Sequence, residues 1–110
     1  MTCRVLVRGK DIINDVTRED AEYVGIDKVA EILDNGMAVP GTVVEWLPEE
    51  VRNVFENADV ILAKGQGNVE SLYEEGYHIF YLFLCKCEHF TKLFHTPLYG
   101  GMFHEENKTP

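Results

Sequence analysis

The segment from Lys64 to Asn68, KGQGN, places a cation, two glycines and an amide between a hydrophobic run and a helix-prone segment. Gly65 and Gly67 let backbone N–H groups approach an anion closely, and the start of a helix adds unpaired N–H groups. The lysine supplies a full positive charge. These groups suit a phosphate or a carboxylate. A glycine-rich strand-to-helix turn with an exposed lysine explains the same residues equally well, and the spacing matches neither the P-loop nor the dinucleotide fingerprint.

Asn14 and Asp15 form a second polar pair, at the end of an extended segment expected over residues 11–15. A carboxylate at a strand end is a natural ligand for a hard divalent cation such as magnesium or manganese. One aspartate is a poor metal site alone, however, and a turn or helix cap before Thr17 is favoured by the residues themselves. Residues 34–36, Asp-Asn-Gly, are expected to form a solvated turn.

The elements that must position these residues follow from hydrophobic spacing and caps. Strands are predicted at 3–7, 28–33, 59–63 and 78–84, the last two buried on both faces, and helices at 17–25, 48–58 and 68–76. The apolar spacing at 28–33 also fits a helix turn, and a strand entering a ligand-facing loop is preferred there. Thr17 and Asp20 fit a capping box, and Gly25 is the expected stop. This alternation predicts one α/β domain over residues 1–110, a three-layer α/β/α Rossmann-like fold with a mostly parallel sheet. Ligands of such sheets bind beyond the carboxyl ends of the strands.

The composition and net charge of the chain argue against some classes of function. The chain has 110 residues, of which 45% are hydrophobic, and a formal net charge of −9. That charge argues against binding a nucleic-acid backbone or an anionic membrane surface, since both need clustered cations. No signal peptide is visible, and the three cysteines (Cys3, Cys85 and Cys87) lack zinc-finger spacing, so we expect reduced cysteines in a cytoplasmic protein. The four histidines also lack metal-ligand spacing.

Three segments together resemble a known family. They are IINDVTREDAEYVGI at residues 12–26, ILDNGMAVPGTVVE at 32–45, and ADVILAKGQGNVESL at 58–72. Their order and spacing resemble the damage-control phosphatase family, also called the domain of unknown function 89 family, which includes the acidic residue methyltransferase 1-like proteins. The segment FYLFLCKC at 80–87 resembles the next strand of its microbial branch. The match covers about residues 3–88, and KGQGN is its most specific part.

The resemblance implies metal-dependent hydrolysis of phosphate monoesters such as sugar phosphates or damaged phosphometabolites. It makes Asp15 a metal ligand and, with Lys64, a catalytic residue. It also implies that Lys64 clamps the phosphate beside Gly65, Gly67 and Asn68, with Asn14 a weaker addition. The implied cofactor is a divalent metal: Mn, Ni, Co or Mg.

The resemblance is to the C-terminal half of the family, because the upstream aspartate-asparagine pair that completes the family's metal site has no counterpart here. We therefore expect an isolated chain to be weak or inactive without the N-terminal half. The alternative hypothesis is a non-catalytic module that binds a phosphate ligand or a partner, with an exposed sheet edge that invites a homodimer. The tail, about residues 96–110, is expected to fray.

Overall fold

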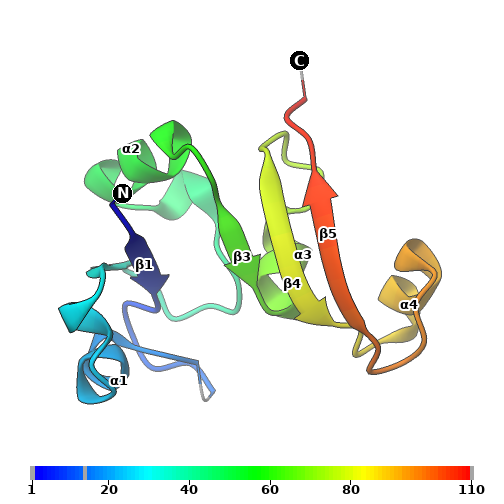
Figure 1. The fold of residues 1–110 in the computed structure, drawn as a ribbon, viewed down its shortest axis with the longest axis horizontal. Helices are drawn as coiled ribbons and strands as arrows, with labels where there is room; N and C mark the ends of the chain where they lie inside the picture. Colours follow the sequence, from blue (N-terminus) through cyan, green and yellow to red (C-terminus); the bar gives the residue numbers. More distant parts are fainter. Residues whose placement is uncertain (1, 14, 110) are drawn as a thin grey trace. The chain divides into compact units, whose positions relative to one another are not determined.

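The computed structural model describes residues 2–13 and 15–109, and the chain divides into two compact units, Met1–Asn57 and Ala58–Pro110. Each unit combines helices with its own small sheet, as the ribbon in Figure 1 shows. The structure is therefore a mixed α/β fold with parallel and mixed sheets, which confirms the coarse class. The prediction of one domain stays a prediction.

The first unit is built on two parallel strands. Strand β1 (Arg4–Val7) pairs with β2 (Glu31–Asp34), so that Val5 lies opposite Ile32. Helix α1 (Arg18–Tyr23) and a 3-10 turn, η1 (Ile26–Lys28), connect them. Their core contains the buried side chains Val7, Ala21 and Ile32, with Val5 and Ile26 packed against it.

The second half of this unit contains a 3-10 turn, η2 (Val44–Trp46), and helix α2 (Glu49–Asn57). The predicted helix at 48–58 is thus confirmed, since Val51 and Phe55 are its buried residues, one turn apart. The prediction of an extended segment at 11–15 is wrong for those of its residues that the structure describes. Apart from Asn14, which lies outside the described residues, these form a loop, with an isolated bridge between Arg8 and Thr17 closing it.

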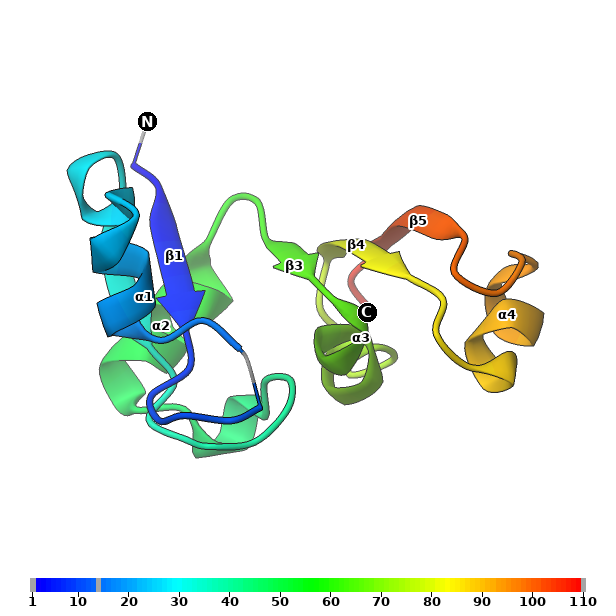
Figure 2. The same cartoon turned by 90° about the horizontal axis from the view of Figure 1, so that it is seen from below.

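The second unit is a three-stranded sheet in the order β3-β4-β5. Strand β3 (Leu62–Lys64) is parallel to β4 (Ile79–Leu84), and β5 (Gly101–Glu106) is antiparallel to β4. Helix α3 (Gln66–Leu72) follows β3, and α4 (Glu88–Phe94) follows β4. Figure 2 shows α3 on one side of the sheet, beneath β3 and β4.

Only one face of this sheet is buried, which corrects the expectation that both faces of its strands would be. Along β4, Ile79, Tyr81 and Phe83 are buried, whereas Leu82 and Leu84 remain 43% and 47% exposed. Phe90 and Phe94 of α4 contact Phe83, so α4 packs against the face of the sheet that carries Phe83. Side chains alternate across a strand, and the leucines therefore lie on the opposite, open face.

The tail also differs from the expectation of fraying. Residues 101–106 form β5, six residues in register with β4 from Ile79 opposite Glu106 to Leu84 opposite Gly101. The Tyr81 hydroxyl donates a hydrogen bond of 2.9 Å to Glu106 Oε1, and the Glu74 N–H donates to Glu106 Oε2 at 2.7 Å. These long-range contacts fix a segment whose local sequence looks polar and loose.

Candidate functional site

The KGQGN segment lies where the sequence predicts it, at the carboxyl end of β3. Lys64 is the last residue of that strand and is exposed, and α3 begins at Gln66, two residues earlier than expected. Gly65 between them has φ of +94°, a conformation that favours glycine. Its N–H donates to the Leu82 carbonyl at 2.8 Å, so this amide extends the β3–β4 pairing and already has an acceptor.

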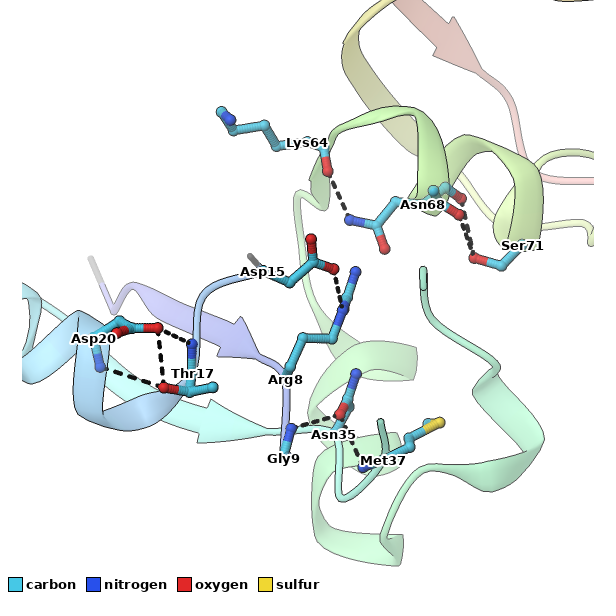
Figure 3. Close-up of polar contacts among 11 residues, drawn as sticks. Arg8, Gly9, Asp15, Thr17, Asp20, Asn35, Met37, Lys64, Asn68 and Ser71 are labelled. Atoms are coloured by element: carbon cyan, nitrogen blue, oxygen red, sulfur yellow. Dashed lines mark hydrogen bonds and ion pairs between the residues drawn. The ribbon is translucent and has the colours of Figure 1, made fainter. Parts of the chain in front are cut away.

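Asn68 stabilises this loop through a hydrogen bond to the loop backbone. Its Nδ2 donates to the Lys64 carbonyl at 2.8 Å, as the dashed line in Figure 3 shows. Ser71 donates from Oγ to the carbonyls of Gly67 and Asn68, at 3.0 and 3.3 Å. The polar side chains of the segment thus fix the turn that presents Lys64.

An open groove of about 260 Å³ adjoins this turn, within the second unit. A Cβ built on Gly65 would meet no atom within 4 Å, in keeping with open space above that residue. The groove has a mostly apolar lining with two cations. It is lined by Lys64, Gly65, Gln66, Leu82, Phe83, Leu84, Lys86 and Gly101.

Lys86 and Gln66 are the polar lining residues that the sequence analysis did not predict. The alternation from Leu82 through Leu84 to Lys86 could have placed Lys86 on the same strand face as the two leucines. Gln66 gives no such signal, because its role depends on a residue 20 positions away: its Oε1 accepts a hydrogen bond from the Lys86 N–H at 2.6 Å.

Asp15, the predicted metal ligand, belongs to the first unit and lies in the loop before α1. Its Oδ2 accepts a hydrogen bond from Arg8 Nε at 3.0 Å, in an ion pair whose side chains are 38% and 11% exposed respectively (Figure 3). Its backbone N–H donates to the Ile12 carbonyl at 3.0 Å. Its neighbour Asn14, predicted to bind substrate, lies outside the described residues.

The described residues do not supply enough clustered ligands to hold a divalent metal ion. Across residues 2–13 and 15–109, three or more His, Cys, Asp or Glu side chains nowhere cluster in a way that could hold a metal ion. The Asp15 carboxylate fits the role of one ligand, since a second acceptor oxygen remains while Arg8 orients the first. It does not make a complete metal centre.

Asn35 corrects the expectation of a solvated turn at residues 34–36. Its side chain is fully buried, and its Oδ1 accepts from the N–H groups of Gly9 at 2.9 Å and Met37 at 3.0 Å (Figure 3). Its Nδ2 is buried without a hydrogen-bond partner among the described residues. Asn35 therefore joins the ends of β1 and β2, a structural role that depends on Gly9, 26 residues upstream.

Nucleophilic chemistry at Cys85 is not favoured by the structure. Cys85 is fully buried, and burial is the main cause that raises the pKa of its thiol, with the neighbouring Cys87 adding to it. A raised pKa disfavours the thiolate, which is the nucleophilic form. All three cysteines are free thiols, as the sequence predicts.

In open α/β sheets, ligands bind beyond the carboxyl ends of the strands, and the lysine-bearing loop of this chain lies at such a strand end. A comparison with known protein families identifies the family to which this chain belongs. Residues 1–100 match the damage-control phosphatase ARMT1-like domain. The chain belongs to this family, which confirms the resemblance seen in the sequence.

Individual relatives agree with this membership. The chain is 42% identical over 87 residues to an uncharacterised protein of Methanocaldococcus jannaschii, and 44% identical over 85 residues to a damage-control phosphatase of Archaeoglobus fulgidus. These matches cover 76% of this chain but only 29% and 30% of the relatives. The chain therefore spans less than a third of the length of the curated relatives it matches.

A solved structure shows the same fold. The crystal structure of a DUF89 family protein from Pyrococcus horikoshii matches with a TM-score of 0.88 and 30% identity, over 94% of this chain and 37% of that one. In the part of this chain that the structure describes, no helix has the length and apolar character needed to span a membrane.

Proposed function

We propose that this chain is the C-terminal portion of a metal-dependent phosphatase that hydrolyses phosphate monoesters, such as sugar phosphates or damaged phosphometabolites. The observation that carries the proposal is the position of Lys64 in a chain of the damage-control phosphatase family. The lysine is exposed at the carboxyl end of β3, beside the parallel strand β4, and its turn is fixed by Asn68. Strand ends of this kind are where α/β proteins bind their ligands.

In this proposal Lys64 binds the phosphoryl group and neutralises charge on it during transfer. Asn68 positions Lys64 through its hydrogen bond to the lysine carbonyl. Gly65 and Gly67 keep the backbone of the turn close to the ligand, and Asn14 adds a substrate contact.

Asp15 contributes one ligand to a divalent metal, Mn, Ni, Co or Mg, and Arg8 holds its carboxylate in place. The metal would act as a Lewis acid toward a phosphoryl oxygen. We propose that the remaining ligands come from the N-terminal half of the longer protein. The proposed substrate is a small phosphate ester in the cytoplasm, with neither nucleic acid nor membrane as partner, and the proposed fold is the three-layer Rossmann-like one.

A second candidate function is a non-catalytic module that binds a phosphate ligand or a partner subunit, as a homodimer or with the missing half. The observation that favours it is the pairing of Asp15 with Arg8, combined with the lack of a metal cluster in the described part of the chain. An ion-paired carboxylate alone gives little metal affinity, whereas the groove beside Lys64 needs no metal to attract an anion.

Phosphate release from a panel of sugar phosphates tests both. The purified chain is assayed with manganese, cobalt, nickel or magnesium and then with excess chelator. We expect at most weak release from the isolated chain, sensitive to chelator, abolished in Asp15→Ala and reduced in Lys64→Ala, with Asp59→Ala, an exposed aspartate, as the matched control. Equal release by Asp15→Ala and the parent would remove the metal assignment. A folded chain that binds phosphate but releases none would favour the second function.

A further inference from the structure

The strand register of the second unit brings two lysines to one groove. Lys64 of β3 lies opposite Leu82 of β4, and paired residues of neighbouring strands point to the same face of a sheet. Leu84 follows on that face, and Lys86 lies beyond the strand's end and lines the same groove. Both lysines thus lie at the carboxyl ends of adjacent parallel strands.

Gln66 fixes the distance between the two lysine-bearing segments. Its Oε1 accepts from the Lys86 N–H at 2.6 Å, and its own backbone follows Lys64 by two residues. Its Nε2 donates to Glu70 Oε1 at 3.0 Å and contacts Cys87 Sγ at 3.9 Å. Both the oxygen and the nitrogen of the Gln66 side-chain amide therefore have partners, and the loop after β4 is held against the loop after β3.

Neither lysine is neutralised inside the described part of the chain. The ion pairs there join other residues: Arg4 to Glu31, Arg8 to Asp15, Arg18 to Asp34 and His78 to Glu105. Lys64 and Lys86 are exposed and line the groove, so both ammonium groups are accessible to an anion that enters it. Two nearby cations repel each other, and a bound dianion removes that repulsion.

We propose that Lys86 is a second phosphate-binding cation, which together with Lys64 clamps the dianionic group of a phosphate monoester in this groove, with Gln66 as the residue that positions it. This inference rests on the proposed function and extends it by one binding residue. The exposed Leu82 and Leu84 give the groove an apolar floor, which suits an ester whose organic part has an apolar face.

Titration calorimetry with inorganic phosphate tests the clamp in the full chain. Lys64→Ala and Lys86→Ala should each weaken binding by about tenfold, the loss expected when one hydrogen bond to a charged group is removed. Lys86→Arg should restore most of the affinity, because it keeps the charge. Lys92→Ala removes an exposed lysine of α4 outside the groove and should leave the affinity unchanged. Circular dichroism of each variant checks that the fold is intact.

The double variant tests whether the two lysines bind the same anion. If both lysines hold the same anion, Lys64→Ala and Lys86→Ala together should cost an amount that differs from the sum of the single losses. Parental phosphate affinity in folded Lys86→Ala, or no phosphate binding by the parent chain, would overturn the clamp.

The sugar-phosphate assay separates this inference from the proposed function. Metal-dependent release that is lost in Asp15→Ala and Lys64→Ala but unchanged in Lys86→Ala would remove Lys86 and leave the function standing. Phosphate binding that needs both lysines, in a chain that releases no phosphate, would keep the clamp and favour the non-catalytic module over the phosphatase.

Discussion

At the scale of single residues, Tyr81 combines a buried hydroxyl-bearing side chain with a carboxylate partner, Glu106. Its side chain is fully buried, and its hydroxyl donates to Glu106 Oε1 at 2.9 Å. Burial raises the pKa of the Tyr81 hydroxyl well above its usual value of 10.0, and the hydrogen bond and charge of Glu106 raise it further. The folded state therefore holds this proton more tightly than the unfolded state does.

This difference predicts a loss of stability in alkali. Because the folded pKa is raised, the contribution is fully present below the unfolded pKa of about 10 and declines as pH rises above it, by about 1.4 kcal/mol per pH unit. Urea unfolding at pH 9, 10 and 11 measures it. The parent should lose more unfolding free energy over this range than Tyr81→Phe does. Identical slopes for the two chains would contradict the shift.

Gly9 lies very close to the backbone of Gly36 in the first unit. A Cβ at this position would lie 2.5 Å from Gly36 Cα and 2.6 Å from Gly36 N, which are backbone atoms that cannot move aside cheaply. Gly9→Ala should therefore lower the free energy of unfolding by about 2 kcal/mol or more. Gly101→Ala is the matched control, since its Cβ would meet only Leu84 Cδ2 at 4.0 Å. Denaturant midpoints of the two variants check the prediction, and equal midpoints would refute it.

At the scale of elements, α1 shows how local chemistry starts a helix. Thr17 accepts the Asp20 N–H on its hydroxyl, and the Asp20 carboxylate accepts the Thr17 N–H at 3.0 Å, which is a complete capping box. Thr17→Ala should lower stability by about 1 kcal/mol. Thr2→Ala, an exposed threonine outside any helix or strand, should have almost no effect in the same urea titration. A neutral Thr17→Ala would show that packing alone holds α1.

The elements that could be predicted are those whose causes are local. The capping box spans four residues, and the buried face of α2 follows from the spacing of Val51 and Phe55, so both helices can be predicted from the sequence. Strand β5 is different, because it forms by pairing with β4 and through Tyr81, 25 residues from Glu106. A local pattern contains no information about such a partner.

The candidate site likewise combines features with local causes, which can be predicted from the sequence, and contacts between distant residues, which cannot. The position of Lys64 follows from a hydrophobic run and two glycines, all within a few residues. The partners that define the site chemistry are distant: the Leu82 carbonyl takes the Gly65 N–H, and Gln66 binds the Lys86 backbone. Residue types alone therefore identify the lysine but not the groove around it.

At the scale of the whole molecule, the charge of −9 predicts how salt acts on stability. Excess like charge destabilises a compact chain by self-repulsion, and salt screens it over a Debye length of about 10 Å at 0.1 M. Raising sodium chloride from 10 to about 150 mM at pH 7 should therefore increase the thermal midpoint by a few degrees. Near the calculated pI of about 4.8 the same salt step should do much less. A midpoint that falls with salt at pH 7 would contradict this view.

The open face of the second sheet has a practical consequence for work at the bench. Leu62, Leu82, Leu84 and Phe103 are 59%, 43%, 47% and 63% exposed, and the register aligns them on one side of β3, β4 and β5. Fluorescent dyes that brighten on apolar surfaces bind such a patch in native protein as well as in melted protein. A dye-based melting curve of this chain would start from a bright baseline and show little rise. Trp46 is itself 64% exposed, so its emission would also change little, and circular dichroism is the better reporter of melting.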